Sequence, residues 1–188
     1  MLPSIRVVIV NWNSGELLSR CLVSIDSVQR NDFLVESVVI VDNSSTDGSA
    51  DNLKLENHKL ILISNDNNSG FGAACNQGAM GSRTEYLLFL NPDARLFPKS
   101  LDVSIQFMEH PRNSRIGICG VQLVNDQNCI SHSCARFPEA THFLSAMFGL
   151  NRIAPHRFPS VALVEWDHAE ARAVDHVIGA FLDRKSVV

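Results

Sequence analysis

The sequence has little that would place the protein across a membrane or on nucleic acid. Its longest strongly apolar run, 143–150, is far shorter than the ~20 residues of a membrane-spanning helix. Sixteen Lys and Arg stand against twenty Asp and Glu, so no broad nucleic-acid-binding surface is expected. The opening residues Met-Leu-Pro-Ser-Ile-Arg lack the basic and then apolar stretches of a secretory signal. The composition instead predicts a folded domain in the cytoplasm.

Cysteines are few, odd in number and irregularly spaced. No two of them form a Cys-x-x-Cys pair, so we expect reduced thiols and no disulfide framework. Cys129, His132 and Cys134 have a spacing that resembles part of a zinc site. A fourth ligand at finger-like spacing is missing, so we do not expect zinc there.

Glycine-rich phosphate loops are also missing. No Gly-x4-Gly-Lys-Ser/Thr is present, which excludes a P-loop nucleotidase. Gly70-Phe71-Gly72 begins a dinucleotide pattern, but it follows the third predicted strand and has Cys75 where the last Gly or Ala belongs. A bound diphosphate would therefore need another counter-charge. A divalent cation held by Asp93 would supply it, and oxygen ligands suit Mg²⁺ or Mn²⁺.

Strand and helix patterns alternate four times before residue 111. Apolar runs rich in β-branched residues predict buried strands at 5–10, 38–41, 60–63 and 86–90. Helical spacing of apolar residues predicts helices at 17–28, 70–82 and 97–108. This order predicts an α/β fold with a Rossmann-like, mainly parallel sheet flanked by helices.

The pattern is less regular after residue 111. Segment 116–124 is strand-like, and 125–128 predicts a turn into a return strand. Segment 140–158 is apolar and carries Arg152 and Arg157 near its end. It predicts either a helix covering the core, which is the commoner case, or a helix lying on a membrane surface.

Polar side chains follow each of the four predicted strands. In open α/β sheets, ligands bind outside the carboxyl ends of the strands. Each cluster alone is ordinary turn chemistry, so Asp93 could be a turn residue and Asp42 a helix cap. Together they predict a site for a polar ligand with many hydrogen-bonding groups. The clusters contain Asn11 and Asn13, then Asp42, Asn43 and Ser45, then Asn68 and Gly70, and last Asn91 and Asp93.

These clusters resemble the nucleotide-binding half of the family 2 glycosyltransferases, which have the GT-A fold. The likeness is greatest to the rhamnosyltransferase-like branch. The matching segments occur in the family's order over nearly the whole chain. They are Val8-Ile9-Val10-Asn11-Trp12-Asn13, 39–48, Asn68-Ser69-Gly70-Phe71, Asn76-Gln77-Gly78, 86–93, Trp166-Asp167-His168 and 174–181.

The resemblance implies a nucleoside-diphosphate sugar as ligand, with dTDP-rhamnose as the suggested donor. Asp42 would accept a hydrogen bond from the base, and Asp93 would hold Mg²⁺ or Mn²⁺. Asn91 stands where many relatives have a first Asp. The donor-binding residues implied are Val10, Asn11, Asn13, Asp42, Asn43, Ser45, Asn68, Gly70, Asn76, Asn91 and Asp93.

The resemblance also implies inverting sugar transfer to a saccharide or lipid-linked acceptor in polysaccharide assembly. We expect residues 1–137 to form the donor domain and 138–188 to begin an incomplete acceptor side. The family's general base is expected beyond residue 188, so we expect the chain to bind donor but to transfer sugar poorly. A non-catalytic nucleotide-sugar-binding or regulatory module is the alternative. If segment 140–158 lies on a membrane rather than on the core, it would touch the inner face of that membrane.

Overall fold

The computed structural model describes residues 2–29, 32–131, 133–163, 166–177 and the backbone of 181–185. His132 of the zinc-like spacing and the Gly179-Ala180 step of the last matching segment lie outside the described residues. The chain divides into two compact units. The first comprises 1–119 with 179–188, and the second comprises 120–178.

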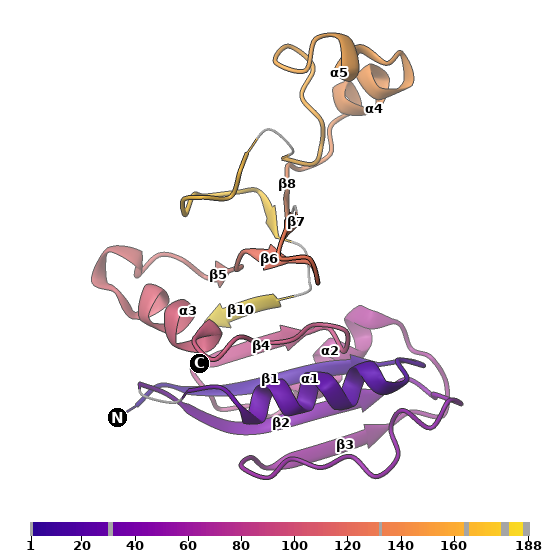
Figure 1. Cartoon of the computed structure of the whole chain (residues 1–188), viewed down its shortest axis with the longest axis vertical. Helices are drawn as coiled ribbons and strands as arrows, with labels where there is room; N and C mark the ends of the chain where they lie inside the picture. The colour runs from indigo at the N-terminus through magenta and orange to yellow at the C-terminus, as the bar shows by residue number, and fades with distance from the viewer. Residues whose placement is uncertain (1, 30–31, 132, 164–165, 178–180, 186–188) are drawn as a thin grey trace. The chain divides into compact units, whose positions relative to one another are not determined.

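The first unit is built on a six-stranded sheet (Figure 1). Its spatial order is β3-β2-β1-β4-β10-β5. Strands β1 to β4 run parallel, and β10 lies antiparallel to both β4 and β5. This confirms the predicted α/β fold with a mainly parallel sheet. The strands are β1 (Ser4–Asn11), β2 (Leu34–Asp42), β3 (Leu60–Ser64), β4 (Tyr86–Leu90), β5 (Ile118–Cys119) and β10 (Phe181–Lys185).

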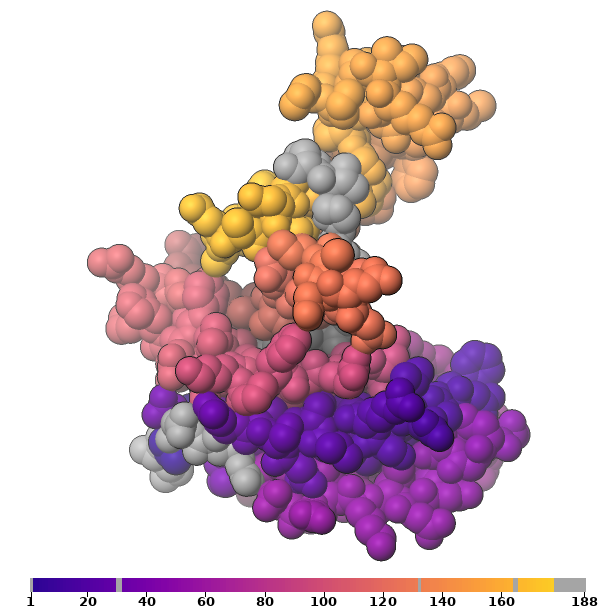
Figure 2. All heavy atoms as spheres, in the orientation of Figure 1, coloured from indigo at the N-terminus to yellow at the C-terminus, as the bar shows by residue number. Residues whose placement is uncertain are grey.

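Within the described residues, three α-helices belong to this unit, close to the predicted positions. They are α1 (Glu16–Asp26), α2 (Phe71–Ala79) and α3 (Ser100–Glu109), and a 3₁₀ turn, η1 (Pro111–Asn113), follows α3. The step from β1 to β2 and the step from β3 to β4 cross the sheet in opposite directions. Because parallel crossovers are right-handed, α1 and α2 cover opposite faces of the sheet. Figure 2 shows the spheres of this part of the chain closely packed on the visible face.

Helix α2 lies very close to the sheet, as its small residues predict. A Cβ atom on Gly78 would lie 2.5 Å from Cγ1 of Val8 and 3.2 Å from Cγ2 of Val41. On the same face, Val10 packs in a buried cluster with Ala74 and Cys75. The side chain of Val10 is therefore part of the core and is not available to contact a donor.

The second unit contains two short antiparallel strand pairs. The first pair, β6 (Leu123–Val124) and β7 (Ile130–Ser131), confirms the predicted turn and return strand. The other consists of β8 (Cys134–Ala135) and β9 (His176–Val177). The prediction of one strand over 116–124 was wrong, because β5 ends at Cys119 and β6 begins at Leu123. A Cβ on the intervening Gly120 would lie 2.2 Å from Cγ1 of Val177.

The unit boundary differs from the predicted functional division at 137/138. Nothing in the sequence pattern predicted that β10 would return to the sheet between β4 and β5, which joins this strand to the first unit. The functional division into 1–137 and 138–188 stays a prediction.

Segment 140–158 forms two short helices rather than one. Helix α4 (Ala140–Met147) and helix α5 (Leu150–Ile153) are separated at Gly149, whose φ of +67° is left-handed. A left-handed residue ends an α-helix, which explains the break. None of the helices in the described ranges combines the length and apolar character that crossing a bilayer requires.

Candidate functional site

The four polar loops begin at one edge of the sheet. In the parallel register Asn11 lies opposite Asp42, and Asp42 lies opposite Ser64. Leu90 lies opposite Ile9, so Asn91 leaves the sheet at the same edge. The structure therefore brings the loops after β1, β2, β3 and β4 together, as their places after parallel strands predicted (Figure 1).

Asn11 is the centre of a buried hydrogen-bond network that joins the first two loops. Its Nδ2 donates to Oδ1 of Asp42 at 2.7 Å, Oγ of Ser49 at 2.9 Å and Oγ of Ser45 at 3.0 Å. The Ser14 hydroxyl donates in turn to Oδ1 of the Asn11 side chain. Asn11 is fully buried, so its side chain holds the loops in place and is not a surface that a ligand could touch.

Asp42 is also buried and organises the loop that follows it. Oδ2 accepts from the backbone N–H of Ser45 at 3.0 Å, and Oδ1 accepts from the Ser45 hydroxyl at 2.6 Å. The alternative of Asp42 as a helix cap was wrong, because no helix lies in the fully described stretch between β2 and β3 and the carboxylate instead holds the loop. An ionised carboxylate has about four acceptor positions. These two bonds and the one from Asn11 leave room for a further donor on Oδ2.

Three more contacts tie the first loop to the second. The backbone N–H of Asn13 donates to Oγ of Ser45 at 2.9 Å, and the Thr46 N–H donates to Oδ1 of Asn13 at 2.8 Å. Asp47 accepts from the backbone N–H of Gly15, the residue that precedes α1, at 2.8 Å. Hydrogen bonds from the Ser49 side chain and backbone, and from Gly15, lower the pKa of Asp47. This carboxylate therefore stays charged at neutral pH beside the start of α1.

A second amide network holds the loop after β3. Asn65 and Gln77 exchange reciprocal hydrogen bonds at 3.0 and 2.9 Å. Asn43 accepts from Nδ2 of Asn65 at 2.9 Å and from the Ser69 hydroxyl at 3.2 Å. The predicted site residues did not include Asn65, Gln77, Asp47 or Ser49. Gln77 lies in a segment that matches the family, but its pairing with Asn65 is visible only in three dimensions.

Gly70 sets the direction in which α2 leaves this edge. Its backbone has φ +84° and ψ 159°, a region that essentially only glycine occupies. Oδ1 of the exposed Asn68 accepts from the Gly70 N–H at 2.9 Å and fixes the turn. Asn76 is exposed on α2. Of the predicted donor-binding residues, Asn13, Asn68, Gly70 and Asn76 are thus exposed at or near the edge.

Asn91 and Asp93 lie on the loop after β4, which contacts α1. The Cys21 thiol on α1 donates to the Asn91 backbone carbonyl at an Sγ–O distance of 3.7 Å. Burial, and then the negative charge of Asp93, raises the pKa of Cys21 to about 12. Asp93 itself is exposed, so its carboxylate is open to solvent and to a ligand.

The residues around Asp93 fit a Mg²⁺ or Mn²⁺ ion that bridges to a substrate. Within the part of the chain that the structure describes, no three His, Cys, Asp or Glu side chains gather into a protein-only metal cage. Mg²⁺ commonly takes one or two carboxylates, several waters and the phosphates of its substrate. One exposed carboxylate with a nearby amide meets that requirement.

The raised pKa of Cys21 predicts an inert thiol beneath the edge. At pH 8 only roughly one molecule in ten thousand would carry the reactive thiolate there. We expect Ellman's reagent to modify the exposed Cys129 within the mixing time and Cys21 only upon unfolding. Mass spectrometry of the labelled peptides would locate the reacted thiols. Rapid labelling of Cys21 in the native chain would contradict the burial seen here.

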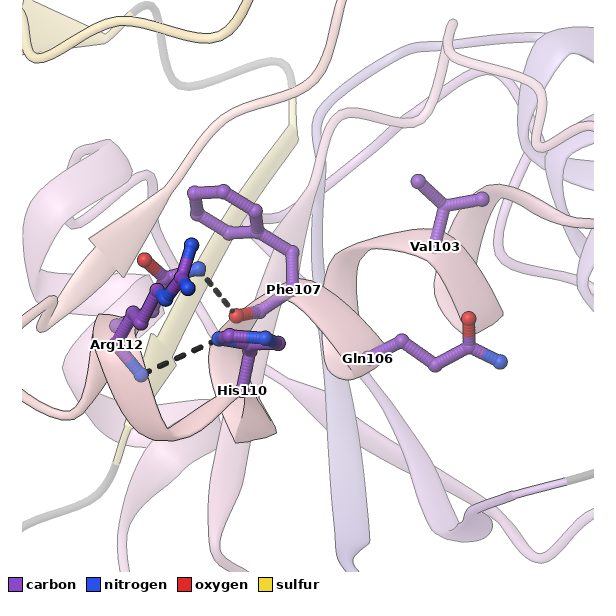
Figure 3. A pocket seen from close by; sticks show the side chains of 6 residues that line it. Val103, Gln106, Phe107, His110 and Arg112 are labelled. Carbon is purple, nitrogen blue, oxygen red and sulfur yellow. Dashed lines mark hydrogen bonds between the residues drawn. The ribbon is translucent and has the colours of Figure 1, made fainter.

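A shallow hollow of about 450 Å³ lies at the opposite edge of the sheet. Figure 3 shows Phe107, His110 and Arg112 along it, at the end of α3. The nearby Glu109 accepts from the hydroxyl of Tyr86, the first residue of β4. The hollow is therefore separate from the polar loops at the strands' carboxyl ends.

In the second unit, His168 of the matching Trp166-Asp167-His168 segment is buried. Its ring stacks on Trp166 with a centroid distance of 4.0 Å. The Arg172 guanidinium lies 5.2 Å from the Trp166 ring centroid. The backbone carbonyl of His168 accepts from Gln122 at 2.9 Å, which joins this segment to the residues before β6.

Two curated relatives are similar to this chain in sequence over part of its length. A glycosyltransferase of Methanocaldococcus jannaschii named MJ1057, described as uncharacterized, is 25% identical over 68% of this chain and 45% of its own length. A putative colanic acid biosynthesis glycosyl transferase of Escherichia coli, WcaA, is 33% identical over 57% of this chain and 38% of its own length. The chain thus spans less than half the length of these relatives.

Solved structures share the fold. The mannosyltransferase PcManGT from Pyrobaculum calidifontis, solved with GDP-Man and Mn²⁺, matches 98% of this chain and 45% of its own with a TM-score of 0.56 at 19% identity. Staphylococcus aureus TarS 1–349 with UDP-GlcNAc matches 74% of this chain and 38% of its own with a TM-score of 0.53 at 19% identity. The fold is the GT-A arrangement that the resemblance implied. The profile of Glycosyl transferase family 2 matches residues 6–165, so the chain belongs to that family.

Proposed function

We propose that the carboxyl edge of the first unit binds a nucleoside-diphosphate sugar for inverting transfer to a saccharide or lipid-linked acceptor. The main support for this proposal is that four polar loops converge at this edge. The buried side chain of Asn11 joins two of these loops through hydrogen bonds. Family membership supports a sugar nucleotide as ligand, and the colanic acid relative supports polysaccharide assembly. We further propose that the protein works in the cytoplasm.

The nucleoside is proposed to lie over the first two loops. Oδ2 of Asp42 has room for another hydrogen bond, which a base N–H would donate. Asn13 is exposed beside it, and its backbone is held by Ser45 and Thr46. A preorganised loop loses little conformational freedom on binding, which favours affinity. Asn68, Gly70 and Asn76 would line the other side of the proposed nucleoside site.

The diphosphate is proposed to lie near Asp93. A Mg²⁺ or Mn²⁺ ion held by this carboxylate, with Asn91 offering an amide oxygen, would offset the charge that develops on the departing diphosphate. PcManGT was solved with Mn²⁺, which supports a divalent cation in proteins of this fold. The chain's own part is to present Asp93 to the ligand on a loop that α1 supports through Cys21.

The sugar is proposed to be a deoxyhexose, with dTDP-rhamnose as donor. The support is the resemblance to the rhamnosyltransferase-like branch, in which Asn commonly stands at the position of Asn91. TarS and PcManGT were solved with UDP-GlcNAc and GDP-Man, so those two donors are the natural competitors.

Titration calorimetry of the chain with Mn²⁺ and each of these three sugar nucleotides tests the proposal. We expect saturable binding, tightest for dTDP-rhamnose, and loss of base discrimination in Asp42→Asn. Asp32→Asn is a matched control, because Asp32 is an exposed carboxylate outside the four loops, where it accepts from Gln106. Absence of binding for all three donors would end the proposed function, and preference for another base would end the rhamnose assignment alone.

A transfer assay separates the enzyme from a nucleotide-sugar-binding or regulatory module. The chain is incubated with radiolabelled dTDP-rhamnose, Mn²⁺ and saccharide or lipid-linked acceptors. Because we expect this chain to transfer sugar poorly, slow but measurable labelling of the acceptor supports a transferase. Donor binding with no labelling above that of a reaction without protein supports the module.

A further inference from the structure

The helices α4 and α5 expose apolar side chains that a water-soluble helix would normally bury. Phe143, Leu144, Met147, Phe148 and Ile153 are between 55% and 80% exposed. On α4, the buried residue is Ser145, whose hydroxyl donates to the backbone carbonyl of His142. The polarity of α4 is therefore the reverse of that expected when the apolar stripe of a helix faces a protein core.

The exposed apolar residues lie on one side of the helix. Phe143, Leu144 and Met147 occupy positions i, i+1 and i+4, which share one side of an α-helix. The left-handed Gly149 then turns the chain, and the N–H of Arg152 donates back to the Gly149 carbonyl at 3.1 Å. Figure 1 shows α4 and α5 next to each other. Several large apolar side chains thus gather on one short stretch of chain.

The positive charge of the segment that contains α4 and α5 favours an anionic partner. Segment 136–158 carries Arg136, Arg152 and Arg157 against a single acid, Glu139, although the whole chain has a net charge of −4. Arg152 is exposed in the last turn of α5, and Arg157 is exposed just beyond it. Exposed aromatic and aliphatic side chains beside arginines suit a partner with an apolar interior and an anionic surface layer. A lipid bilayer with anionic headgroups has both properties.

We propose that α4 and α5 dock the protein on an anionic lipid surface. The helices lie in the headgroup region, with Phe143, Leu144, Met147 and Phe148 inserted at the acyl boundary. Arg152 and Arg157 contact the lipid phosphates. This is peripheral contact, since one short apolar face with a few basic residues gives reversible binding. The inference does not rest on the proposed nucleotide-sugar site.

Vesicle flotation of the 188-residue chain tests the docking. Vesicles of phosphatidylcholine alone are compared with vesicles that contain phosphatidylglycerol, at low and at high salt. We expect the chain to float with the anionic vesicles, and we expect added salt to weaken this binding because it screens the arginines. Equal binding to both kinds of vesicle, or none to the anionic ones, would overturn the proposal.

Two variants locate the contact. F143S/F148S should reduce the fraction bound about tenfold or more, since membrane affinity follows the apolar area inserted. V23S/V103S is the matched control, because Val23 and Val103 are similarly exposed on helices of the first unit. We expect this control to bind like the unaltered chain. Equal loss in both variants, or no loss in the first, would overturn the assignment of the surface.

A second copy of the chain is the competing occupant of the apolar face. Sedimentation velocity without lipid measures it in the same protein preparations. A monomer that floats with anionic vesicles supports lipid docking. A dimer that F143S/F148S dissociates would instead assign the face to self-association and overturn the proposal. Circular dichroism of each variant confirms that the fold is retained, so that a loss of binding reports the surface.

Discussion

Asp93→Ala is expected to abolish the Mn²⁺-dependent part of nucleoside diphosphate binding. Asp93 carries the exposed carboxylate on the loop after β4, and its negative charge contributes to the raised pKa of Cys21 on α1. Without it the cation keeps only waters and phosphate oxygens, and the diphosphate loses its anchored counter-charge. We expect on the order of 100-fold weaker binding, which corresponds to ~2.7 kcal/mol. Calorimetry with dTDP and Mn²⁺, repeated with EDTA, measures the effect.

The control for this experiment removes an equal charge elsewhere. Asp32→Ala deletes an exposed carboxylate outside the four loops. It should leave the Mn²⁺-dependent affinity unchanged, because a charge farther away than a Debye length of about 8 Å is largely screened. If Asp93→Ala binds dTDP with the same Mn²⁺-dependence as the unaltered chain, Asp93 has no metal role.

Gly78→Val is expected to have the largest effect on stability. A Cβ atom alone at this position would come within 2.5 Å of Cγ1 of Val8, and a branched side chain would collide further with Val41. Both valines are buried in the central strands, so neither can swing into solvent. Overpacking of this kind costs about 3 kcal/mol in a tight core. Urea unfolding followed by circular dichroism would give the loss.

The same helix offers the matched control. Gly72 also lies in α2, but nothing comes within 4 Å of a Cβ added there. Gly72→Ala should therefore stabilise the fold by roughly 0.5–1 kcal/mol, because alanine is the better helix former. If both substitutions change the unfolding free energy by the same amount, close packing of α2 on the sheet is not the reason for glycine at position 78.

The predictions held best where a signal is local and repeated. The β-branched runs of β1 and β2 and the apolar spacing of α1 each depend on neighbours within one element, so the strands and helices could be placed closely. The structure of segment 140–158 was harder to predict. Its composition is apolar throughout, so the sequence does not show which side of a helix would be buried. The left-handed Gly149 and the exposure of Phe143 and Met147 are properties of the folded segment.

The α/β class, and the edge of the sheet at which the polar loops gather, could be predicted from the sequence without coordinates. The carboxyl ends of parallel strands all lie at one edge of the sheet. Residues that directly follow these strands in the chain therefore lie close together in space. The tertiary structure alone decided which polar residues are buried supports and which are open to a ligand. Asn11 and Asn13 differ by two positions, yet one is fully buried and the other exposed. That difference depends on partners such as Ser45 and Ser49, which lie more than thirty residues away in the chain.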